Sequence, residues 1–174
     1  VDDRAAAYQA VSYLIQQGHR KIAVLGGPAT SHPSMMRRQG AQQAMEDAGI
    51  RFEDKLYGLS NYDFESAYHA MNGLLARRAE FTALFAMSDV IAFGAIRALV
   101  SAGLRVPEDV SVIGFDGITM SRYCVPVMTT IVQPSEQIAL QSIELLVRQI
   151  EHGTPAQTVT LQPELQQGES VRAL

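Results

Sequence analysis

The chain has 174 residues, of which 47% are hydrophobic, so it is long enough to bury a substantial core and is expected to be globular. Charged residues make up only 18%, the formal net charge is −4, and the 14 Lys and Arg residues form no cluster longer than a pair. This charge pattern excludes a phosphate-tracking surface for nucleic acid within the chain. The single cysteine, Cys124, excludes an internal disulfide framework and favours a reducing compartment.

No apolar run approaches the length of a membrane span, and no secretory signal peptide precedes Val1. Because the chain also lacks an initiator methionine, we interpret it as a piece of a longer cytoplasmic protein. Any part of that protein that contacts DNA is expected to lie outside this segment.

Short apolar runs alternate with amphipathic helical stretches along the first two thirds of the chain. The apolar runs are 21–25, 56–60, 83–87 and 110–115. The helices are expected from about Asp3 to Gly18, Ser34 to Gly49, Phe64 to Arg77 and Asp89 to Ala102. This βαβ alternation predicts an α/β fold built on a parallel sheet with helices on both faces.

The helix expected over 89–102 is apolar around nearly its whole circumference, with only Arg97 and Ser101 polar in VIAFGAIRALVSA. One sheet covers only one side of a helix, which leaves Phe93 and Val100 on another side. A helix that is hydrophobic all round lies either deep in a large protein or at an interface. For a domain of this size we favour a symmetric homodimer contact, with burial under a lobe outside the chain as the alternative.

The pattern changes after Thr130. TTIVQ is expected to be extended, and Ser135 then caps a helix that ends near Gly153, with an apolar face formed by Leu140, Ile143, Val147 and Ile150. TVTLQPELQQGESV is interpreted as two short strands separated by Pro163. A helix that follows the parallel units needs a further surface to cover its apolar face.

An acid ends the apolar run at 110–115, because Asp116 follows it directly between Gly114 and Gly117. In open α/β sheets ligands bind in the crevice beyond the carboxyl ends of the strands, so Asp116 is well placed to meet one. A carboxylate that only caps a turn is the alternative. Arg37, in the helix after the first strand, is placed to reach the same crevice, although Arg38 is its rival.

A planar guanidinium and a carboxylate together suit the vicinal hydroxyls of a sugar or ribose. Tyr62, beyond the strand at 56–60, is placed to stack on such a ring, and packing in the core is the alternative. Asp89 is expected to be the N-cap of its helix, which leaves the Ser88 hydroxyl for the crevice. His32 is one of the polar residues of the loop after the first strand, which we interpret as a ligand rim.

Neither cofactor nor catalytic motifs are found. Gly26-Gly27-Pro28 stands where a dinucleotide-binding fold has its glycines, but GxGxxG and GxxxxGK[ST] are absent. The four histidines, at 19, 32, 69 and 152, show no metal-ligand spacing, and no GxSxG occurs. We therefore expect no cofactor, no metal site and no catalytic residue.

Seven segments, in this order and spacing, resemble the effector-binding core of the LacI/GalR (lactose and galactose repressor) family of bacterial transcription regulators. They are VDDR, YLIQQGHRKIAVLGGP, RRQGAQQAMEDAGI, FESAY, FTALFAMSDVIAFGAIRAL, GLRVPEDVSVIGFD and PVMTTIVQP. The resemblance implies a periplasmic-binding-protein-like (type I) fold of two α/β subdomains, with an effector between them and a helix-turn-helix headpiece before them. It assigns 1–128 and 163–174 to the C-terminal subdomain, and 129–162 to a crossing segment and helix of the N-terminal subdomain. The headpiece and most of the N-terminal subdomain would then lie outside the chain.

Position by position, the resemblance places Arg37 on the family's effector-binding arginine, Asp116 on its effector-binding acid and Tyr62 on its stacking aromatic. Ser88 stands where many members have Asn, and Pro33 where many have a small polar residue, so recognition of hydroxyls is expected to differ in detail. Gly117 likewise replaces a second acid or amide.

Family dimers pair through the helix after Asp89 and the segment 120–125, which implies an interface containing Phe93, Arg97, Val100, Met120 and Tyr123. The sequence thus predicts the effector-sensing and dimerisation domain of a repressor that binds a sugar or glycoside, and a nucleoside meets nearly the same requirements. A periplasmic sugar-binding transport receptor of the same fold is the alternative, although the lone cysteine and the apolar helix stand against it. An enzyme would need the cofactor fingerprint that is missing.

Overall fold

A six-stranded sheet with strand order β2-β1-β3-β4-β5-β6 lies at the centre of the computed structural model, which describes residues 1–153 and 155–174. The strands are β1 (Ile22–Gly26), β2 (Tyr57–Leu59), β3 (Ala83–Ala86), β4 (Ser111–Asp116), β5 (Thr129–Val132) and β6 (Glu164–Gln166). The first five run parallel, and β6 pairs antiparallel with β5. The predicted α/β class with a parallel sheet is therefore confirmed, with an antiparallel edge strand that the alternation did not reveal.

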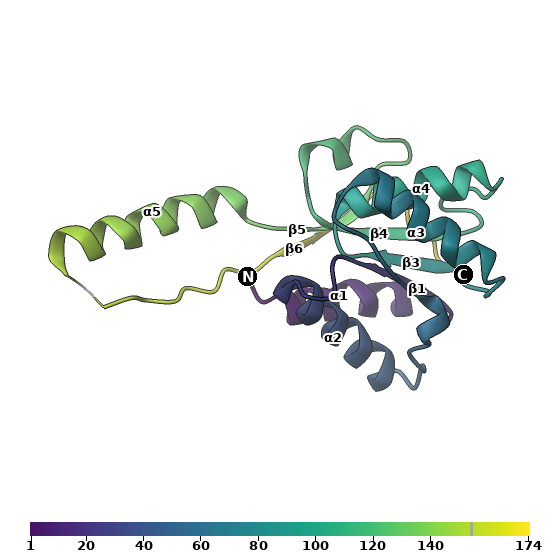
Figure 1. Ribbon diagram of the computed structural model, residues 1–174, viewed down its shortest axis with the longest axis horizontal. Helices are drawn as coiled ribbons and strands as arrows, with labels where there is room; N and C mark the ends of the chain where they lie inside the picture. The colour runs from purple at the N-terminus through teal and green to yellow at the C-terminus, as the bar shows by residue number, and fades with distance from the viewer. Residues whose placement is uncertain (154) are drawn as a thin grey trace.

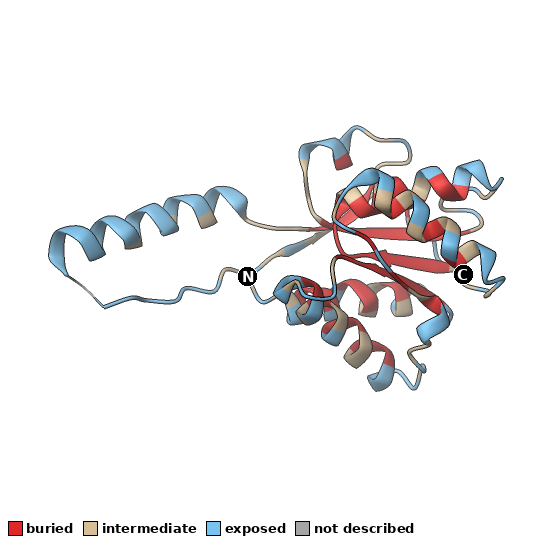
Figure 2. Ribbon diagram, in the orientation of Figure 1, coloured by how far each residue is buried: buried red, intermediate tan, exposed pale blue. Residues whose placement is uncertain are grey.

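Two pairs of helices cover the two faces of this sheet (Figure 1). The helices α1 (Asp3–Gln16) and α2 (His32–Asp47) pack together on one face, and α3 (Phe64–Ala76) and α4 (Asp89–Ser101) on the other. Every residue of β1 and β3 is buried as a result (Figure 2). Burial on both faces explains why these strands are continuous apolar runs and do not alternate with polar residues. Two short 3₁₀ turns, η1 (Asp54–Leu56) and η2 (Thr119–Arg122), complete this body.

Close approach of α3 and α4 requires a glycine at position 94. A Cβ on Gly94 would lie 2.6 Å from the Phe64 carbonyl oxygen and 2.7 Å from the Ala67 Cβ, whereas one on Gly73 of α3 would meet nothing within 4 Å. We expect Gly94→Ala to lower the free energy of unfolding by about 2 kcal/mol through overpacking. Gly73→Ala should raise it by about 0.5–1 kcal/mol, because alanine loses less backbone entropy in a helix. Urea denaturation of both variants measures the two effects, and changes of the same sign would contradict this packing.

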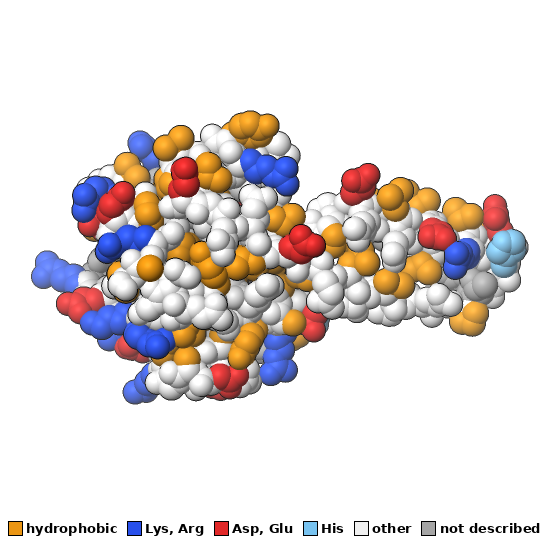
Figure 3. Space-filling view, turned by 180° about the vertical axis from the view of Figure 1, so that it is seen from behind, with side chains coloured by type: hydrophobic (Ala, Val, Ile, Leu, Met, Phe, Trp, Pro, Cys, Tyr) orange, Lys and Arg blue, Asp and Glu red, His pale blue; other side chains and the backbone are white. Residues whose placement is uncertain are grey.

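The helix α5 (Ser135–His152) extends away from the body, and the chain returns beside it (Figure 1). We call α5 with residues 155–163 the outlying lobe. No residue of α5 is buried (Figure 2), and hydrophobic side chains are seen on the surface of this lobe in Figure 3. The predicted helix is confirmed, but only one of the two strands expected around Pro163 forms, namely β6. Residues 158–162 have no neighbouring strand to pair with among the described residues, so a strand there is a wrong expectation.

The segment 129–162, for which a separate subdomain is expected, begins inside the sheet, because Thr129 to Val132 form β5 and pair with β4. Residue 154 of this segment lies outside the described residues. The division into subdomains stays a prediction. Over 1–153 and 155–174, no helix combines the length and the apolar character that crossing a membrane requires.

Candidate functional site

Arg37 of α2 occupies the carboxyl ends of β3 and β4. Its Nε donates to an Asp3 carboxylate oxygen at 2.7 Å, and its Nη1 donates to the Met87 carbonyl and lies 3.5 Å from Oδ1 of Asp116. The guanidinium carbon lies 3.7 Å from the centre of the Phe115 ring, a cation–π contact. The residue is only 6% exposed, so its charge is held by neighbours and not by bulk water.

Arg38, the rival arginine, faces elsewhere. Its guanidinium carbon lies 4.5 Å from the centre of the Tyr57 ring, and its Nη2 lies 3.6 Å from a carboxylate oxygen of Asp54. The structure thus joins Arg37, and not Arg38, to Asp116.

Asp116 ends β4 with a φ of 115°, a left-handed backbone conformation that non-glycine residues rarely adopt. Its Oδ1 accepts a hydrogen bond from Nε2 of Gln133 at 2.7 Å. Burial raises the pKa of Asp116, while the positive charge of Arg37 and the Gln133 hydrogen bond oppose that rise. The side chain nevertheless keeps 27% exposure, and its Oδ2 accepts no hydrogen bond from the described residues. Strained backbone of this kind gathers at functional sites.

Tyr62 follows β2 with a φ of 60°, and its ring covers Gly27, where a Cβ would lie 2.1 Å from a ring carbon. Its hydroxyl is buried and has no hydrogen-bond partner within the described parts of the chain. Buried polar atoms in native proteins normally have a partner, which makes this hydroxyl exceptional.

Ser88 and Asp89 do not take the roles that the sequence predicts. Ser88 is the N-cap of α4, with its Oγ accepting from the Ile91 N–H at 3.1 Å, and it is 4% exposed. The expectation that Asp89 caps the helix and leaves the Ser88 hydroxyl free is therefore wrong. Asp89 is fully buried instead, where it accepts from the Thr130 hydroxyl and from the Ile118 N–H. Because these two partners, which are distant in the sequence, bind the carboxylate of Asp89, the neighbouring Ser88 caps the helix.

Asp89 is also electrostatically unusual. Burial raises the pKa of its carboxyl group to about 6, and the nearby negative charge of Asp116 adds to the rise, while hydrogen bonds from Thr130 and Ile118 oppose it. Sequence reasoning missed this residue as part of the site, and it also missed Gln133. The available signals were Gly114, which leaves room for a carboxylate beside the strand, and the position of Gln133 directly after β5.

The other predicted effector residue, His32, begins α2 and is exposed. Among the residues described, no hydrogen bond or ion pair connects His32, Tyr62 or Ser88 to Arg37 or Asp116. Only the arginine and the acid are brought into direct contact, and the remaining three border the same end of the sheet.

The surface that is predicted to form the dimer interface is apolar and open. Phe93 of α4 stacks on Phe64 with ring centres 6.2 Å apart, and both border a shallow hollow of about 410 Å³ that also includes Arg97. Val100, Met120 and Tyr123 are all exposed large hydrophobic residues. The α4 helix therefore presents its inner side to the sheet and α3, and its outer side to solvent.

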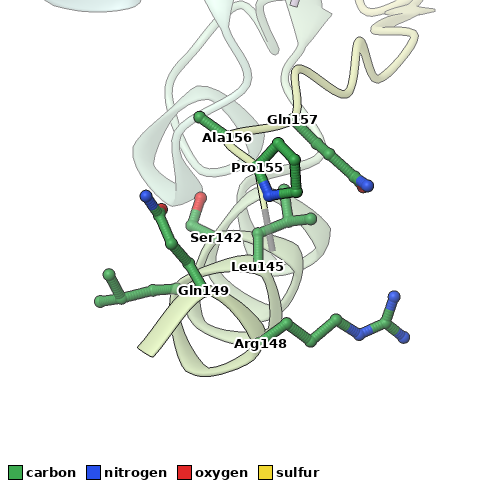
Figure 4. A pocket seen from close by; sticks show the side chains of 8 residues that line it. Ser142, Leu145, Arg148, Gln149, Pro155, Ala156 and Gln157 are labelled. Carbon is green, nitrogen blue, oxygen red and sulfur yellow. The ribbon is translucent and has the colours of Figure 1, made fainter. Parts of the chain in front are cut away.

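Of two further hollows, one lies beside the site and the other lies apart from it. One of about 680 Å³ adjoins the end of β4 and is lined by residues 117–119, 122 and 132–137. Another, of about 360 Å³, lies in the outlying lobe between α5 and residues 155–157, with Leu145 and Pro155 facing each other (Figure 4). None of the predicted effector residues lines the second hollow.

Comparison with known proteins supports the resemblance noted in the sequence. Residues 11–171 match the periplasmic binding protein-like domain. The chain is 37% identical over 171 residues to the HTH-type transcriptional repressor PurR of Histophilus somni, covering 98% of this chain and 51% of that protein. PurR of Salmonella paratyphi B is also 37% identical, over 96% of this chain and 49% of that protein. The chain thus spans about half the length of the curated relatives it matches.

Solved structures support the same family. A sugar-binding transcriptional regulator of the LacI family from Escherichia coli, complexed with phosphate, superimposes with a TM-score of 0.92 at 33% identity, covering 100% of this chain and 63% of that one. A complex of the transcriptional regulator CelR with cellobiose gives a TM-score of 0.93 at 34% identity, covering 98% and 52%. These relatives are transcriptional regulators and not enzymes. By both sequence and fold, the chain belongs to the LacI/GalR family of transcriptional regulators, of which it is a periplasmic-binding-protein-like, effector-binding core.

Proposed function

We propose that the chain is the effector-sensing and dimerisation domain of a cytoplasmic bacterial repressor that binds a small sugar-like molecule at Arg37 and Asp116. Effector binding changes how two subunits are held, and so how tightly headpieces outside this chain bind a palindromic operator. The observation that carries the proposal is the buried Arg37 beside the partly exposed Asp116, with Nη1 and Oδ1 3.5 Å apart at the ends of the strands.

The chemistry of this pair suits a vicinal diol. One hydroxyl donates to Oδ2 of Asp116, and a neighbouring hydroxyl oxygen accepts from the guanidinium of Arg37. Tyr62 supplies a flat ring and a hydroxyl that lacks a partner among the described residues. Sugars and glycosides present such diols, and a nucleoside does so through its ribose. The named relatives that are sugar-binding or complexed with cellobiose favour the sugar.

Removing the negative charge of Asp116 tests the assignment. We expect Asp116→Asn to weaken effector binding by about 1.5–3 kcal/mol, the range for a lost hydrogen bond to a charged group. Titration calorimetry measures this for the best binder from a thermal-shift screen of mono- and disaccharides and nucleosides. Asp109→Asn is the matched control, because Asp109 is bound to Arg105 away from the site. Equal affinity of wild type and Asp116→Asn would rule out this site.

The dimer interface is proposed at the outer face of α4 with the η2 segment, through Phe93, Arg97, Val100, Met120 and Tyr123. These residues leave an apolar surface without cover in the single chain, and a two-fold contact buries it against its own copy.

Phe93→Glu should convert the dimer to a monomer, because a carboxylate would be buried at the two-fold contact without a partner. Sedimentation velocity reports the mass of each variant. Met35→Glu introduces the same charge at another exposed hydrophobic residue, on α2, and should leave the dimer intact. A dimer that persists in Phe93→Glu would place the interface elsewhere.

A transport receptor of the same fold is the less favoured function. The named relatives are transcriptional repressors or transcriptional regulators, which supports the regulator.

A further inference from the structure

The chain directly after Asp116 is anchored by one buried carboxylate, that of Asp89 in the first turn of α4. One oxygen of this carboxylate, Oδ2, accepts from the Ile118 N–H at 2.8 Å, two residues beyond Asp116. The other, Oδ1, accepts from the Thr130 hydroxyl at 2.6 Å, on the neighbouring strand β5. Asp89 and Thr130 are both fully buried. One side chain therefore joins α4, the end of β4 and β5.

The surrounding backbone is shaped to hold this carboxylate. A Cβ on Gly114 would lie 2.2 Å from Oδ1 of Asp89, so any larger residue in the strand would displace the acid. Gly117 has a φ of 70° and turns the chain so tightly against β5 that its own Cβ would lie 2.7 Å from the Cα of Val132. The turn at Gly117 and the space that Gly114 leaves by having no side chain together direct the Ile118 N–H onto the carboxylate of Asp89.

The backbone of Asp116 is also bound to the end of β5, the strand that contains Thr130. The Asp116 carbonyl oxygen accepts from the Gln133 N–H at 3.0 Å, and Gln133 follows the strand that contains Thr130. Arg37 holds the Met87 carbonyl, two residues before Asp89. Side chains from helices on both faces of the sheet thus bind this end of β4, namely Arg37 of α2 through Asp116 and Asp89 of α4 through Ile118.

We infer that Asp89 is the positioning residue of the candidate effector site, which fixes Asp116 and the segment 117–127 to the first turn of α4. The inference rests on the proposed function in one respect, that Asp116 contacts the effector. Because the outer face of α4 carries Phe93 and Arg97 and the segment 117–127 carries Met120 and Tyr123, the same carboxylate also links the effector acid to the proposed dimer surface. Asp89 itself does not contact ligand.

Backbone hydrogen exchange, resolved by NMR on the protein without ligand, tests this inference. Asp89→Ala removes both acceptors, and we expect protection of the Ile118 and Gln133 amides to fall at least about tenfold, because a buried donor loses its partner. Protection of the β1 amides should not change. Asp89→Asn should restore the protection, because its amide oxygen accepts from Ile118 while its NH₂ donates to the Thr130 hydroxyl.

Thr130→Val keeps the shape of the side chain and carries the test if Asp89→Ala does not fold. It should reduce protection at the same amides by a smaller factor. Asp109→Ala is the control, since it removes another acid that accepts a backbone N–H, from Arg105 at 2.8 Å, and should leave Ile118 and Gln133 unchanged. Unchanged protection in the variants that fold, or an equal loss in β1, would overturn the inference.

The exchange experiment needs no effector, so it is independent of the calorimetric test of Asp116. If the Asp89 variant loses local protection but the protein binds no sugar or nucleoside, the positioning role of Asp89 would stand and the proposed ligand would be rejected. Binding that depends on Asp116, together with unchanged exchange, would retain the ligand site and reject the anchor.

Discussion

Arg37→Ala is expected to lower the free energy of unfolding by about 3 kcal/mol, the lower end of the range for breaking a buried ion pair. The substitution removes the partner of Asp3 and Asp116 and leaves both acids uncompensated near the end of the sheet. It also removes a guanidinium that lies 3.7 Å from the centre of the Phe115 ring. Urea denaturation with a linear extrapolation to water measures the change.

Arg38→Ala is the matched control, because it removes the same charge from the next position of α2. Its side chain is 39% exposed and pairs with an exposed Asp54, so a loss of about 1 kcal/mol or less is expected. In the double variant Arg37→Ala/Asp116→Asn, part of the loss should be recovered, since one of the uncompensated charges is gone. Similar losses for Arg37→Ala and Arg38→Ala would mean that burial does not distinguish them.

Asp89→Asn should remove a pH-dependent loss of stability. The pKa of Asp89 is about 6 in the folded protein, raised from 3.8. Below both values the carboxyl group is protonated in the folded and unfolded chains. Between them the folded protein keeps a proton that the unfolded chain has released, so stability falls as pH rises through the folded pKa. Above about pH 7 the loss is complete and amounts to up to about 3 kcal/mol.

The difference between the two proteins is the quantity to measure, because other groups also titrate. Burial raises the pKa of Asp116, which acts in the same direction, and burial lowers the pKa of His19, which acts in the opposite one. Urea denaturation of wild type and Asp89→Asn from pH 4 to pH 8 should show the variant gaining relative stability as pH rises. A constant difference across this range would mean that Asp89 titrates as it does in the unfolded chain.

The neighbours Ser88 and Asp89 show where local reasoning stops. Both residue types are good N-caps, so the sequence around them cannot choose between them. The choice is made by Thr130 and Ile118, which are 41 and 29 residues away from Asp89 and bind its carboxylate. Arg37 and Arg38 pose the same problem, because adjacent residues of a helix point about 100° apart and only the packing of α2 decides which faces the sheet. The antiparallel β6 similarly depends on a partner strand, β5, more than thirty residues earlier in the chain.

The α/β class, the positions of the five main helices, the strand-end acid Asp116 and the family could all be predicted from the amino-acid sequence. Such features are recorded in short-range patterns, namely the period of apolar residues, caps, glycines and the order of family segments. The tertiary fold was needed to show that Arg37 is the arginine beside Asp116, that Asp89 is buried and that Gln133 contacts Asp116. These contacts join residues that lie far apart in the chain and meet only at the carboxyl ends of neighbouring strands, so no local pattern specifies them.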